Sequence, residues 1–185
     1  MNPQAKNVFL TGAPGIGKTT IIRSVLDTLD VEAGGFYTSE MREDGSRVGF
    51  AIVGLNGERG VLAHIDLDSP YRVNRYGVNR DDLERVGIGA LEEATGRAQL
   101  IVMDEIGRME LCSEAFRIAV LRALDSPTPV LGTIQDRSNE FLDSVRARDD
   151  VEIHRVNSGN RDCLVPFLKD RLEELLRDAG EACGS

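Results

Sequence analysis

A glycine-rich turn near the N-terminus constrains the fold of this chain more than any other feature of its sequence. The turn and the residues after it, GAPGIGKTTI at residues 12–21, contain the spacing G-x-x-x-x-G-K-[ST]. The apolar run at residues 8–10 predicts a strand before the turn, and apolar residues at helical spacing between residues 21 and 29 predict a helix after it. A strand, this turn and a helix in that order are typical of a loop that binds phosphate groups, which indicates an α/β protein.

The residue types of the turn suit an anion. Glycines allow backbone amides to approach a phosphate group closely, and the N-terminus of the following helix adds a partial positive charge. We expect the ammonium group of Lys18 to bridge the β- and γ-phosphates of a nucleotide, and the hydroxyl group of Thr19 to bind Mg²⁺. An ordinary glycine-rich turn is the alternative, and it is disfavoured because all four motif positions are filled and both flanking patterns are present.

A second candidate element lies at the end of the run QLIVMDEIG, residues 99–107, which predicts a buried strand that ends on two carboxylates. Open α/β sheets build their ligand crevices at the carboxyl ends of such strands. Asp104 would reach the Mg²⁺ held by Thr19, and Glu105 could accept a proton from a water that attacks the γ-phosphate. The alternative is a solvent-exposed strand end, where acidic residues are common.

The bulk composition bounds the class of protein. The chain has 185 residues, of which 41% are hydrophobic and 29% charged, and we expect one soluble domain over residues 1–185. No apolar run reaches membrane-spanning length and no signal-like segment opens the chain, so we expect a cytoplasmic protein. The net charge of −9 disfavours broad nucleic-acid binding, although a local basic cleft remains compatible with it. Three distant cysteines (Cys112, Cys163 and Cys183) are expected to be reduced thiols, and His64 and His154 surface or strand residues.

The rest of the chain predicts a mostly parallel sheet flanked by helices, with one insertion. Short β-rich runs separated by Asp44-Gly45 and Asn56-Gly57 predict an antiparallel meander over about residues 35–65. A polar, turn-rich stretch follows, and it brings Arg72, Arg75 and Arg80 close together in sequence. Helical spacing resumes near residue 82 and ends near residue 96. Later patterns predict a helix capped by Ser113, a strand PVLGTI, a helix NEFLDSVRAR, a strand VEIHRV and a closing helix CLVPFLKDRLEELLRD.

Base recognition has few candidate residues. The guanine-reading sequence N-K-x-D does not occur after the core strands, and aromatic residues make up 5% of the chain with no tryptophan. We therefore expect loose selectivity for the nucleotide base.

Several longer stretches resemble one known family. GAPGIGKTT, GGFYTSEMR, VGFAIVGLNGERGVLAH, RYGV, IVMDEIGRMEL, VLGTI and NRD occur in the order seen in the small nucleoside-triphosphatases typical of thermophilic prokaryotes, a family that includes the human cancer-related nucleoside-triphosphatase. The resemblance spans residues 8–176. It implies a RecA-like P-loop fold and slow, Mg²⁺-dependent hydrolysis of ATP, GTP and other nucleoside triphosphates to diphosphate and phosphate.

The resemblance also implies roles for residues of this chain. Lys18 and Glu105 would be catalytic, Thr19 and Asp104 would bind the metal ion, and Asn160 or Arg161 would approach the nucleotide. The implied phosphate-binding residues are Gly12, Ala13, Pro14, Gly15, Ile16, Gly17, Lys18, Thr19 and Thr20. One departure from the family is the pair Asn74 and Arg75, which stands where a glycine and a lysine are common.

Three functions remain open on the sequence alone. Hydrolysis is favoured because Glu105 follows Asp104 directly. Transfer of the γ-phosphoryl group to a nucleotide, a nucleic-acid end or a small hydroxyl compound is the second, because the arginines near residue 75 could clamp an acceptor phosphate. A nucleotide-dependent switch is the third. Arg108 would either sense the γ-phosphate or form a salt bridge with Glu105 or Glu110.

Overall fold

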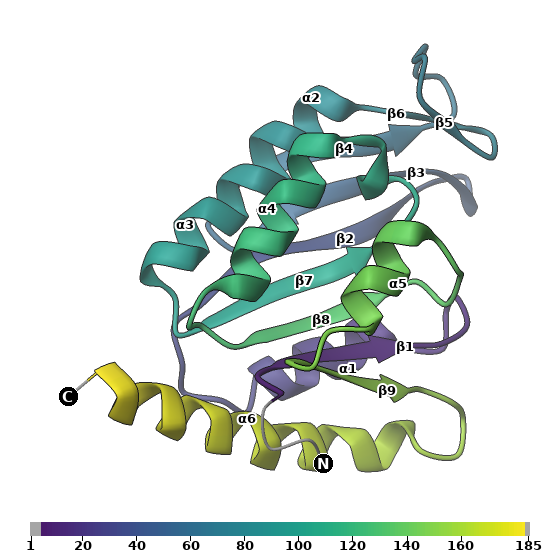
Figure 1. Cartoon of the computed structure of the whole chain (residues 1–185). Helices are drawn as coiled ribbons and strands as arrows, with labels where there is room; N and C mark the ends of the chain where they lie inside the picture. Colours follow the sequence, from purple (N-terminus) through teal and green to yellow (C-terminus); the bar gives the residue numbers. More distant parts are fainter. Residues whose placement is uncertain (1–4, 184–185) are drawn as a thin grey trace.

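One mixed sheet organises the molecule (Figure 1). The computed structural model describes residues 5–183, and within them nine strands form a single sheet in the order β5-β6-β4-β3-β2-β7-β8-β1-β9. The strands are β1 (Asn7–Thr11), β2 (Ala33–Glu43), β3 (Ser46–Gly54), β4 (Arg59–His64), β5 (Arg72–Val73), β6 (Tyr76–Val78), β7 (Leu100–Ile106), β8 (Val130–Ile134) and β9 (Val151–Arg155). The predicted core strands are therefore confirmed.

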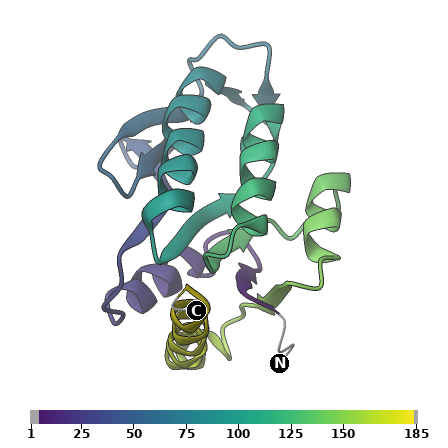
Figure 2. The ribbon, with the colours of Figure 1, turned by 60° about the vertical axis from the view of Figure 1, so that its left-hand side comes forward.

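Helices cover both faces of the parallel part of the sheet (Figures 1 and 2). The helices are α1 (Lys18–Leu26), α2 (Arg80–Asp82), α3 (Gly89–Arg97), α4 (Glu114–Asp125), α5 (Glu140–Arg146) and α6 (Arg161–Cys183). A π-helical segment, Leu83–Ile88, joins α2 to α3, and a 3₁₀ turn, Glu110–Cys112, precedes α4. Buried residues of α3, α4 and α5 pack on one face of the sheet, and those of α1 and α6 pack on the other.

The first strand, β1, shows why the parallel strands appear in the sequence as unbroken runs of apolar residues. Val8 and Leu10 belong to the cluster that contains α1 and α6, whereas Phe9 belongs to the cluster on the opposite face, and all three are fully buried. Alternate residues of a strand point to opposite faces, so a strand covered by helices on both sides must be apolar at every position.

The strand order places the two predicted motifs at one edge of the sheet. β1 leads into the glycine-rich turn, β7 ends on Asp104 and Glu105, and β8 lies between these two strands and pairs with both in parallel. The carboxyl ends of β1, β7 and β8 therefore meet at the right-hand edge of Figure 1, where the site is expected.

The inserted β region extends further than predicted at both ends. β2 begins at Ala33, pairs in parallel with β7 along its first half and runs antiparallel to β3, so the first meander strand is also part of the core sheet. β5 and β6 form a short hairpin in the stretch interpreted as turn-rich, which corrects that interpretation. Strands of two and three residues are too short to leave an alternating pattern that sequence reasoning can detect.

The remaining expectations concern membranes, thiols and histidines. Within residues 5–183 no helix is long and apolar enough to cross a membrane. Cys112 and Cys163 are free thiols as predicted, and the side chain of Cys183 lies outside the described part of the chain. His64 ends β4 and His154 lies on β9, each close to a carboxylate, in agreement with their interpretation as strand residues.

The contact between β2 and β7 depends on one glycine, and this generates a first prediction. Gly35 has φ +108°, and a Cβ atom added there would lie 2.1 Å from the carbonyl oxygen of Val102. We expect Gly35→Ala to lower the free energy of unfolding by about 3 kcal/mol or more, since both the dihedral and the contact are unfavourable. Urea denaturation followed by circular dichroism measures the change.

The control is another glycine-to-alanine change. Gly96 lies near the end of α3 in open space, and Gly96→Ala should raise the free energy of unfolding by about 0.5–1 kcal/mol because alanine favours the helix. Equal effects of the two substitutions would contradict this account of the β2–β7 contact.

Candidate active site

The glycine-rich turn is shaped as an anion cradle. Gly15 and Gly17 have φ +76° and +106°, so the turn uses backbone conformations that other residues avoid. A Cβ atom on Gly12 would lie 2.7 Å from the carbonyl oxygen of Val156, so the start of the turn has no room for a side chain. Lys18 is the first residue of α1, and its Nζ donates to the carbonyl oxygen of Gly12 at 3.1 Å. The lysine thus folds back over the turn.

Asp104 is buried at the carboxyl end of β7, with 2% of its surface exposed. Its Oδ1 accepts a hydrogen bond of 2.6 Å from Thr133 on β8, and its Oδ2 is buried without a hydrogen-bond partner in the described residues. Burial raises the pKa of Asp104, while the hydroxyl groups of Thr133 and Thr19 and the ammonium group of Lys18 act in the opposite direction.

These groups fit a divalent cation. Asp104 offers one uncommitted carboxylate oxygen, and the hydroxyl group of Thr19 is close enough to it to affect the pKa of the aspartate. Oxygen ligands suit Mg²⁺, which often binds through one or two protein oxygens together with substrate phosphates. A buried carboxylate that lacks a partner would be stabilised by such a cation.

Glu105, unlike its neighbour Asp104, is only partly buried. The peptide bond between Asp104 and Glu105 is cis, and the pairing of β7 with β8 is irregular between Met103 and Ile106. Oε1 of Glu105 lies 3.6 Å from Nζ of Lys18, and 31% of the glutamate side chain is exposed. Burial raises the pKa of Glu105, Lys18 lowers it and Asp104 raises it. A raised pKa suits a proton acceptor that works near neutral pH.

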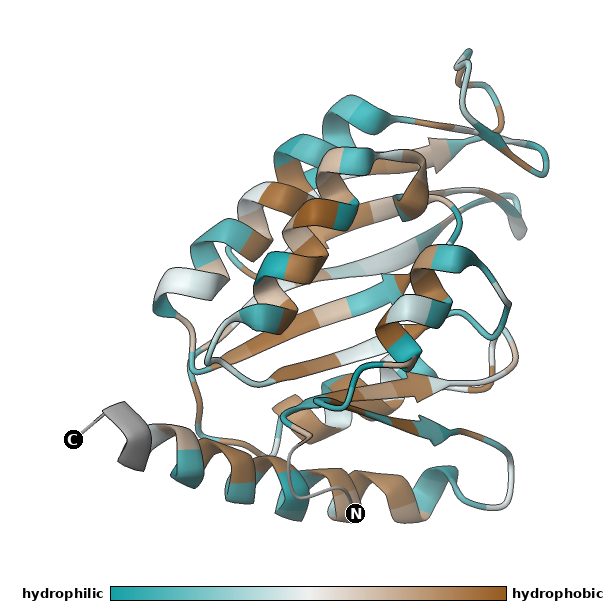
Figure 3. Ribbon diagram, viewed as in Figure 1, coloured by the Kyte–Doolittle hydropathy of each residue, from teal (hydrophilic) through white to brown (hydrophobic). Residues whose placement is uncertain are grey.

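A cleft of about 350 Å³ connects these groups. Pro14, Gly15, Lys18 and Thr19 form one wall, and the ends of β7 and β8 contribute Asp104, Glu105 and Gln135. The opposite wall comes from the inserted β region and includes Thr38, Ser39, Glu40, Arg47, Asn74 and Tyr76. Figure 3 shows β7 changing from hydrophobic to hydrophilic towards its carboxyl end.

Gln135 is a cleft residue that the sequence reasoning missed. It follows β8, the strand between β1 and β7, and its Oε1 is buried without a partner in the described residues. The available signal was its place directly after the apolar run PVLGTI. A polar residue at that place enters the same crevice as Asp104 if the two strands are neighbours, which the sequence alone does not reveal.

The three arginines near residue 75 do not gather in the cleft. Arg72 donates to the carbonyl oxygen of Arg75 at 2.9 Å, and Arg75 donates to the carbonyl oxygen of Arg47. Arg80 binds the hydroxyl group of Tyr71 and pairs with Glu84 at 3.0 Å. None of the three lines the cleft, so the expected clamp for an acceptor phosphate is not assembled there.

Arg108 lines the cleft, and the structure bears on one of its two predicted roles, the salt bridge with Glu105 or Glu110. Glu105 pairs with Lys18, and Oε2 of Glu110 accepts from the backbone amide of Gly107 at 3.0 Å. The predicted salt bridge of Arg108 with either glutamate is therefore wrong. Its guanidinium group instead donates to Oδ1 of Asn74 at 3.4 Å. Asn74 has φ +54°, so asparagine here adopts the left-handed conformation that a glycine would provide.

The C-terminal candidates lie on the other side of the turn. Arg161 and Gly17 line a separate cavity of about 260 Å³ between α1 and the start of α6, together with Thr20, Ile21, Ser24, Asp162 and Val165. Asn160 is occupied within its own turn, because its side chain accepts from the amide of Asn157 and donates to the carbonyl oxygen of Arg155, at 2.9 and 2.8 Å. Arg161 is thus close to the predicted phosphate-binding loop, whereas the side chain of Asn160 is bonded within the turn that precedes α6.

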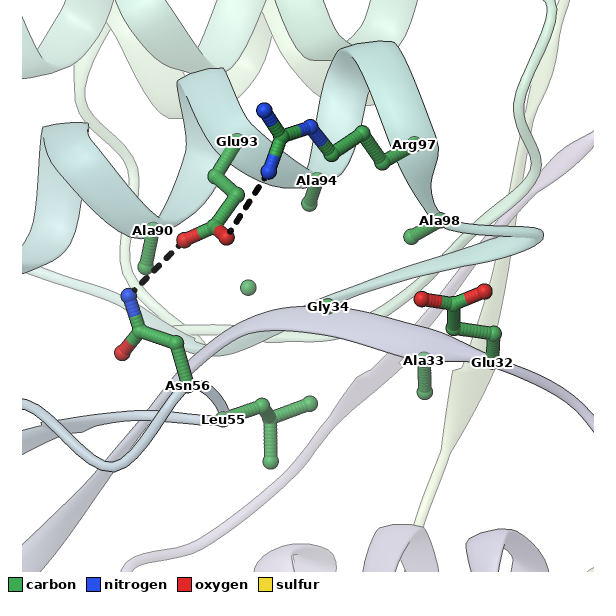
Figure 4. Close-up of a pocket in the computed structure, with 11 residues that line it drawn as sticks. Glu32, Ala33, Gly34, Leu55, Asn56, Ala90, Glu93, Ala94, Arg97 and Ala98 are labelled. Carbon is green, nitrogen blue, oxygen red and sulfur yellow. Dashed lines mark hydrogen bonds and ion pairs between the residues drawn. The ribbon is translucent and has the colours of Figure 1, made fainter.

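A further cavity lies away from all predicted site residues (Figure 4). It has a volume of about 240 Å³ and lies between α3 and the first residues of β2. Glu93 lines this cavity, where its carboxylate accepts a hydrogen bond from Asn56 at 3.0 Å and forms an ion pair with Arg97 at 3.6 Å. Two of its three charged residues therefore pair with each other, and none of its lining residues has a buried side-chain polar atom without a partner, unlike Asp104 and Gln135 in the cleft.

Glu110 generates a prediction on pH. It is 5% exposed, and burial raises its pKa to about 8 from 4.5, against the backbone amides that lower it. Between these values the folded protein holds a proton that the unfolded chain has released, so the free energy of unfolding falls as pH rises, by at most about 1.36 kcal/mol per pH unit. Glu110→Gln does not titrate and keeps an oxygen for the amide of Gly107. Its stability relative to the wild type should therefore increase from about pH 5 to pH 8.

Urea denaturation of both proteins across this range provides the measurement. The quantity of interest is the difference between the two free energies of unfolding at each pH, because other titrating groups affect both proteins equally. A difference that stays constant with pH would contradict a raised pKa of Glu110.

Comparison with known proteins finds relatives over almost the whole chain. A family described as NTPase matches residues 7–168. A protein named nucleoside-triphosphatase THEP1 from Thermotoga sp. (strain RQ2) is 49% identical over 174 residues, which cover 94% of this chain and 98% of that protein. The human protein named cancer-related nucleoside-triphosphatase is 40% identical over 89% of this chain and 95% of its own length.

Two solved structures match the fold. The crystal structure of THEP1 from Aquifex aeolicus has a TM-score of 0.82 and 31% identity, covering 90% of this chain and 99% of that one. The solution structure of the human protein has a TM-score of 0.78 and 37% identity, covering 92% and 98% of the two chains. The predicted P-loop α/β fold is thereby confirmed.

Proposed function

This chain belongs to the NTPase family and is a nucleoside-triphosphatase, and on that premise we propose that it hydrolyses ATP, GTP and other nucleoside triphosphates to diphosphate and phosphate with the help of Mg²⁺. The observation that carries the proposal is the placement of Glu105. A partly exposed carboxylate with a raised pKa lies 3.6 Å from the lysine of the glycine-rich turn, beside a buried aspartate with one free oxygen. That is the arrangement needed to activate a water beside a bound phosphate chain.

Binding of the triphosphate would use the turn and the start of α1. Backbone amides between Gly12 and Thr20 face the phosphate groups, and the helix N-terminus favours their negative charge. Thr19 and Asp104 would hold Mg²⁺, which neutralises charge on the β- and γ-phosphates when it is bound. Lys18 would exchange its contact with Glu105 for one with the γ-phosphate.

Hydrolysis requires a base that is free when the substrate is in place. Lys18 lies 3.6 Å from Glu105 and lowers the pKa of that carboxyl group. Once the phosphates attract Lys18, burial and the neighbouring Asp104 both favour uptake of a proton by Glu105. Glu105 would then orient the attacking water and accept its proton.

Transfer to another acceptor is supported less well. The arginines expected to clamp an acceptor phosphate, Arg72, Arg75 and Arg80, bind backbone carbonyls, a tyrosine and a glutamate outside the cleft. A nucleotide-dependent switch would use the same phosphate site, and no observation favours it over hydrolysis. A cytoplasmic location stays a prediction from the sequence.

Glu105→Gln tests the proposed base. Glutamine preserves size and hydrogen bonding but does not accept a proton at neutral pH. We expect kcat for phosphate release to fall by about 10²–10⁴, the range for loss of a general base, while nucleotide affinity measured by calorimetry stays nearly unchanged. Asp104→Asn is the comparison, and it should weaken Mg²⁺-dependent nucleotide binding as well as kcat. Near-normal phosphate release by Glu105→Gln would contradict the assignment.

Loose base selectivity is a separate prediction. The cavity beside Arg161 has no aromatic lining residue, and a guanidinium plane can lie against any base. We expect kcat/KM for ATP, GTP, CTP and UTP to differ by less than about 100-fold, or about 2.7 kcal/mol. Arg161→Ala should raise KM for all four by similar factors, whereas Lys169→Ala, an exposed change further along α6, should leave KM unaltered. A loss confined to one nucleotide would argue for specific base reading by Arg161.

A further inference from the structure

Arg108 differs from the other cationic side chains of the cleft in having no anionic partner. Three cationic side chains line the cleft in the described part of the chain, namely Lys18, Arg47 and Arg108. Lys18 pairs with Glu105, and Arg47 pairs with Glu40 at 2.6 Å and donates to the hydroxyl group of Tyr76 at 3.2 Å. Arg108 forms no ion pair in the described residues and has only the 3.4 Å hydrogen bond to Asn74, while its Nε is buried without a partner.

The backbone that carries Arg108 is held firmly, so its side chain is the part that can change partner. The amide of Gly107 donates to Glu110, and the amide of Leu111 donates to the carbonyl oxygen of Gly107, both at 3.0 Å. This compact turn begins directly after β7, two residues beyond Glu105. It places the start of the Arg108 side chain at the edge of the sheet where the γ-phosphate is expected.

A bound triphosphate would alter the balance between the two partners of Arg108. The present contact is one long hydrogen bond to a neutral amide oxygen. A terminal phosphate carries charge and offers several oxygens, and guanidinium–phosphate pairs are frequently bidentate, with each hydrogen bond about twice as strong as a neutral one. A buried Nε without a partner adds to the gain, since it leaves donor capacity unused.

We propose that Arg108 is a catalytic residue that leaves Asn74 when a nucleoside triphosphate binds and contacts the γ-phosphoryl group as its charge redistributes during hydrolysis. This inference rests on the proposed triphosphatase function. Asn74 is the positioning residue that holds the guanidinium group near the cleft before substrate arrives. An arginine that stabilises such charge from within its own chain raises kcat more than it lowers KM.

The hydrogen bond between Asn74 and Arg108 would make the contacts of the β5–β6 hairpin depend on whether a triphosphate is bound. Asn74 lies at the turn of this hairpin, between Arg72–Val73 and Tyr76–Val78, and the hairpin shares the right-hand edge of the sheet with the end of β7 (Figure 1). Release of Arg108 removes the hydrogen bond that connects the hairpin to the loop after β7. The left-handed conformation of Asn74 keeps its amide group at the turn, so the acceptor is ready to recapture Arg108 after phosphate leaves.

The first experiment compares Arg108→Ala with a matched control. Arg72→Ala removes an exposed arginine of the same hairpin that lies outside the cleft and binds only a backbone carbonyl. We expect Arg108→Ala to lower kcat by about 10³-fold, the lower end for such an arginine, with KM changed less than about threefold. Arg72→Ala should match the wild type. A kcat of Arg108→Ala within threefold of the wild type overturns the proposal.

A binding measurement separates this inference from the proposed function. ADP with aluminium fluoride imitates the transferring phosphoryl group, so its affinity reports the contact without turnover. We expect Arg108→Ala to lose at least about 100-fold in affinity for this complex, or about 2.7 kcal/mol, and to bind ADP alone as the wild type does. Equal affinities of both proteins for the complex overturn the inference. A wild type that binds the complex but releases no phosphate refutes the proposed function alone.

A double-mutant cycle tests the role of Asn74. Asn74→Asp offers Arg108 a charged partner in place of an amide and should lower kcat by about tenfold or more, because the guanidinium group is then held away from the phosphate. In the Arg108→Ala background the same change should have no further effect. Asn74→Gly, which keeps access to positive φ but removes the acceptor, should lower kcat less than Asn74→Asp does, because it offers Arg108 no competing partner. An equal effect of Asn74→Asp with and without Arg108 shows that Asn74 does not act through it, and overturns that assignment.

Discussion

Burial of a carboxylate at the end of β7 is the constraint on which the rest of the site depends. A buried carboxylate is stabilised by a partner for each oxygen, and among the described residues one oxygen of Asp104 accepts a hydrogen bond from the hydroxyl group of Thr133. The second oxygen has no hydrogen-bond partner in the described residues, and together with Thr19 at the start of α1 it is the group proposed above to hold Mg²⁺. Thr133 belongs to β8, the strand that lies between β1 and β7. Its hydrogen bond helps to orient the carboxylate group of Asp104 at the end of β7.

Local sequence was enough to predict the parts of the site that lie within one strand–turn–helix unit. The spacing of Gly12, Gly17, Lys18 and Thr19 predicts the cradle because the helix begins directly at the lysine. The apolar run before Asp104 predicts the position of this residue at a buried strand end, because the aspartate follows the run directly. In both cases the chemistry and the secondary structure lie on contiguous residues.

Parts of the site that depend on strand order could not be predicted. Thr133 and Gln135 reach Asp104 and the cleft only because β8 lies beside β7, and sequence alone leaves that order open. The contact of Arg108 with Asn74 joins residues 34 positions apart through a hairpin whose strands are two and three residues long. The arginines near residue 75 show the opposite error, since closeness in sequence did not bring them into the cleft.

Two separate spaces, lined by different stretches of the chain, adjoin the glycine-rich turn. The cleft beside Lys18 is completed by residues of the inserted β region, by residues from the end of β7 and by Gln135, whereas the cavity beside Gly17 is completed by Arg161, Asp162 and Val165 at the start of α6. No residue lines both spaces. A substitution that changes the lining of one space therefore leaves the lining residues of the other in place. On the proposed function, the residues around the base and the residues around the cleaved phosphate bond can therefore change independently during evolution, while the glycine-rich turn between them is shared by both spaces.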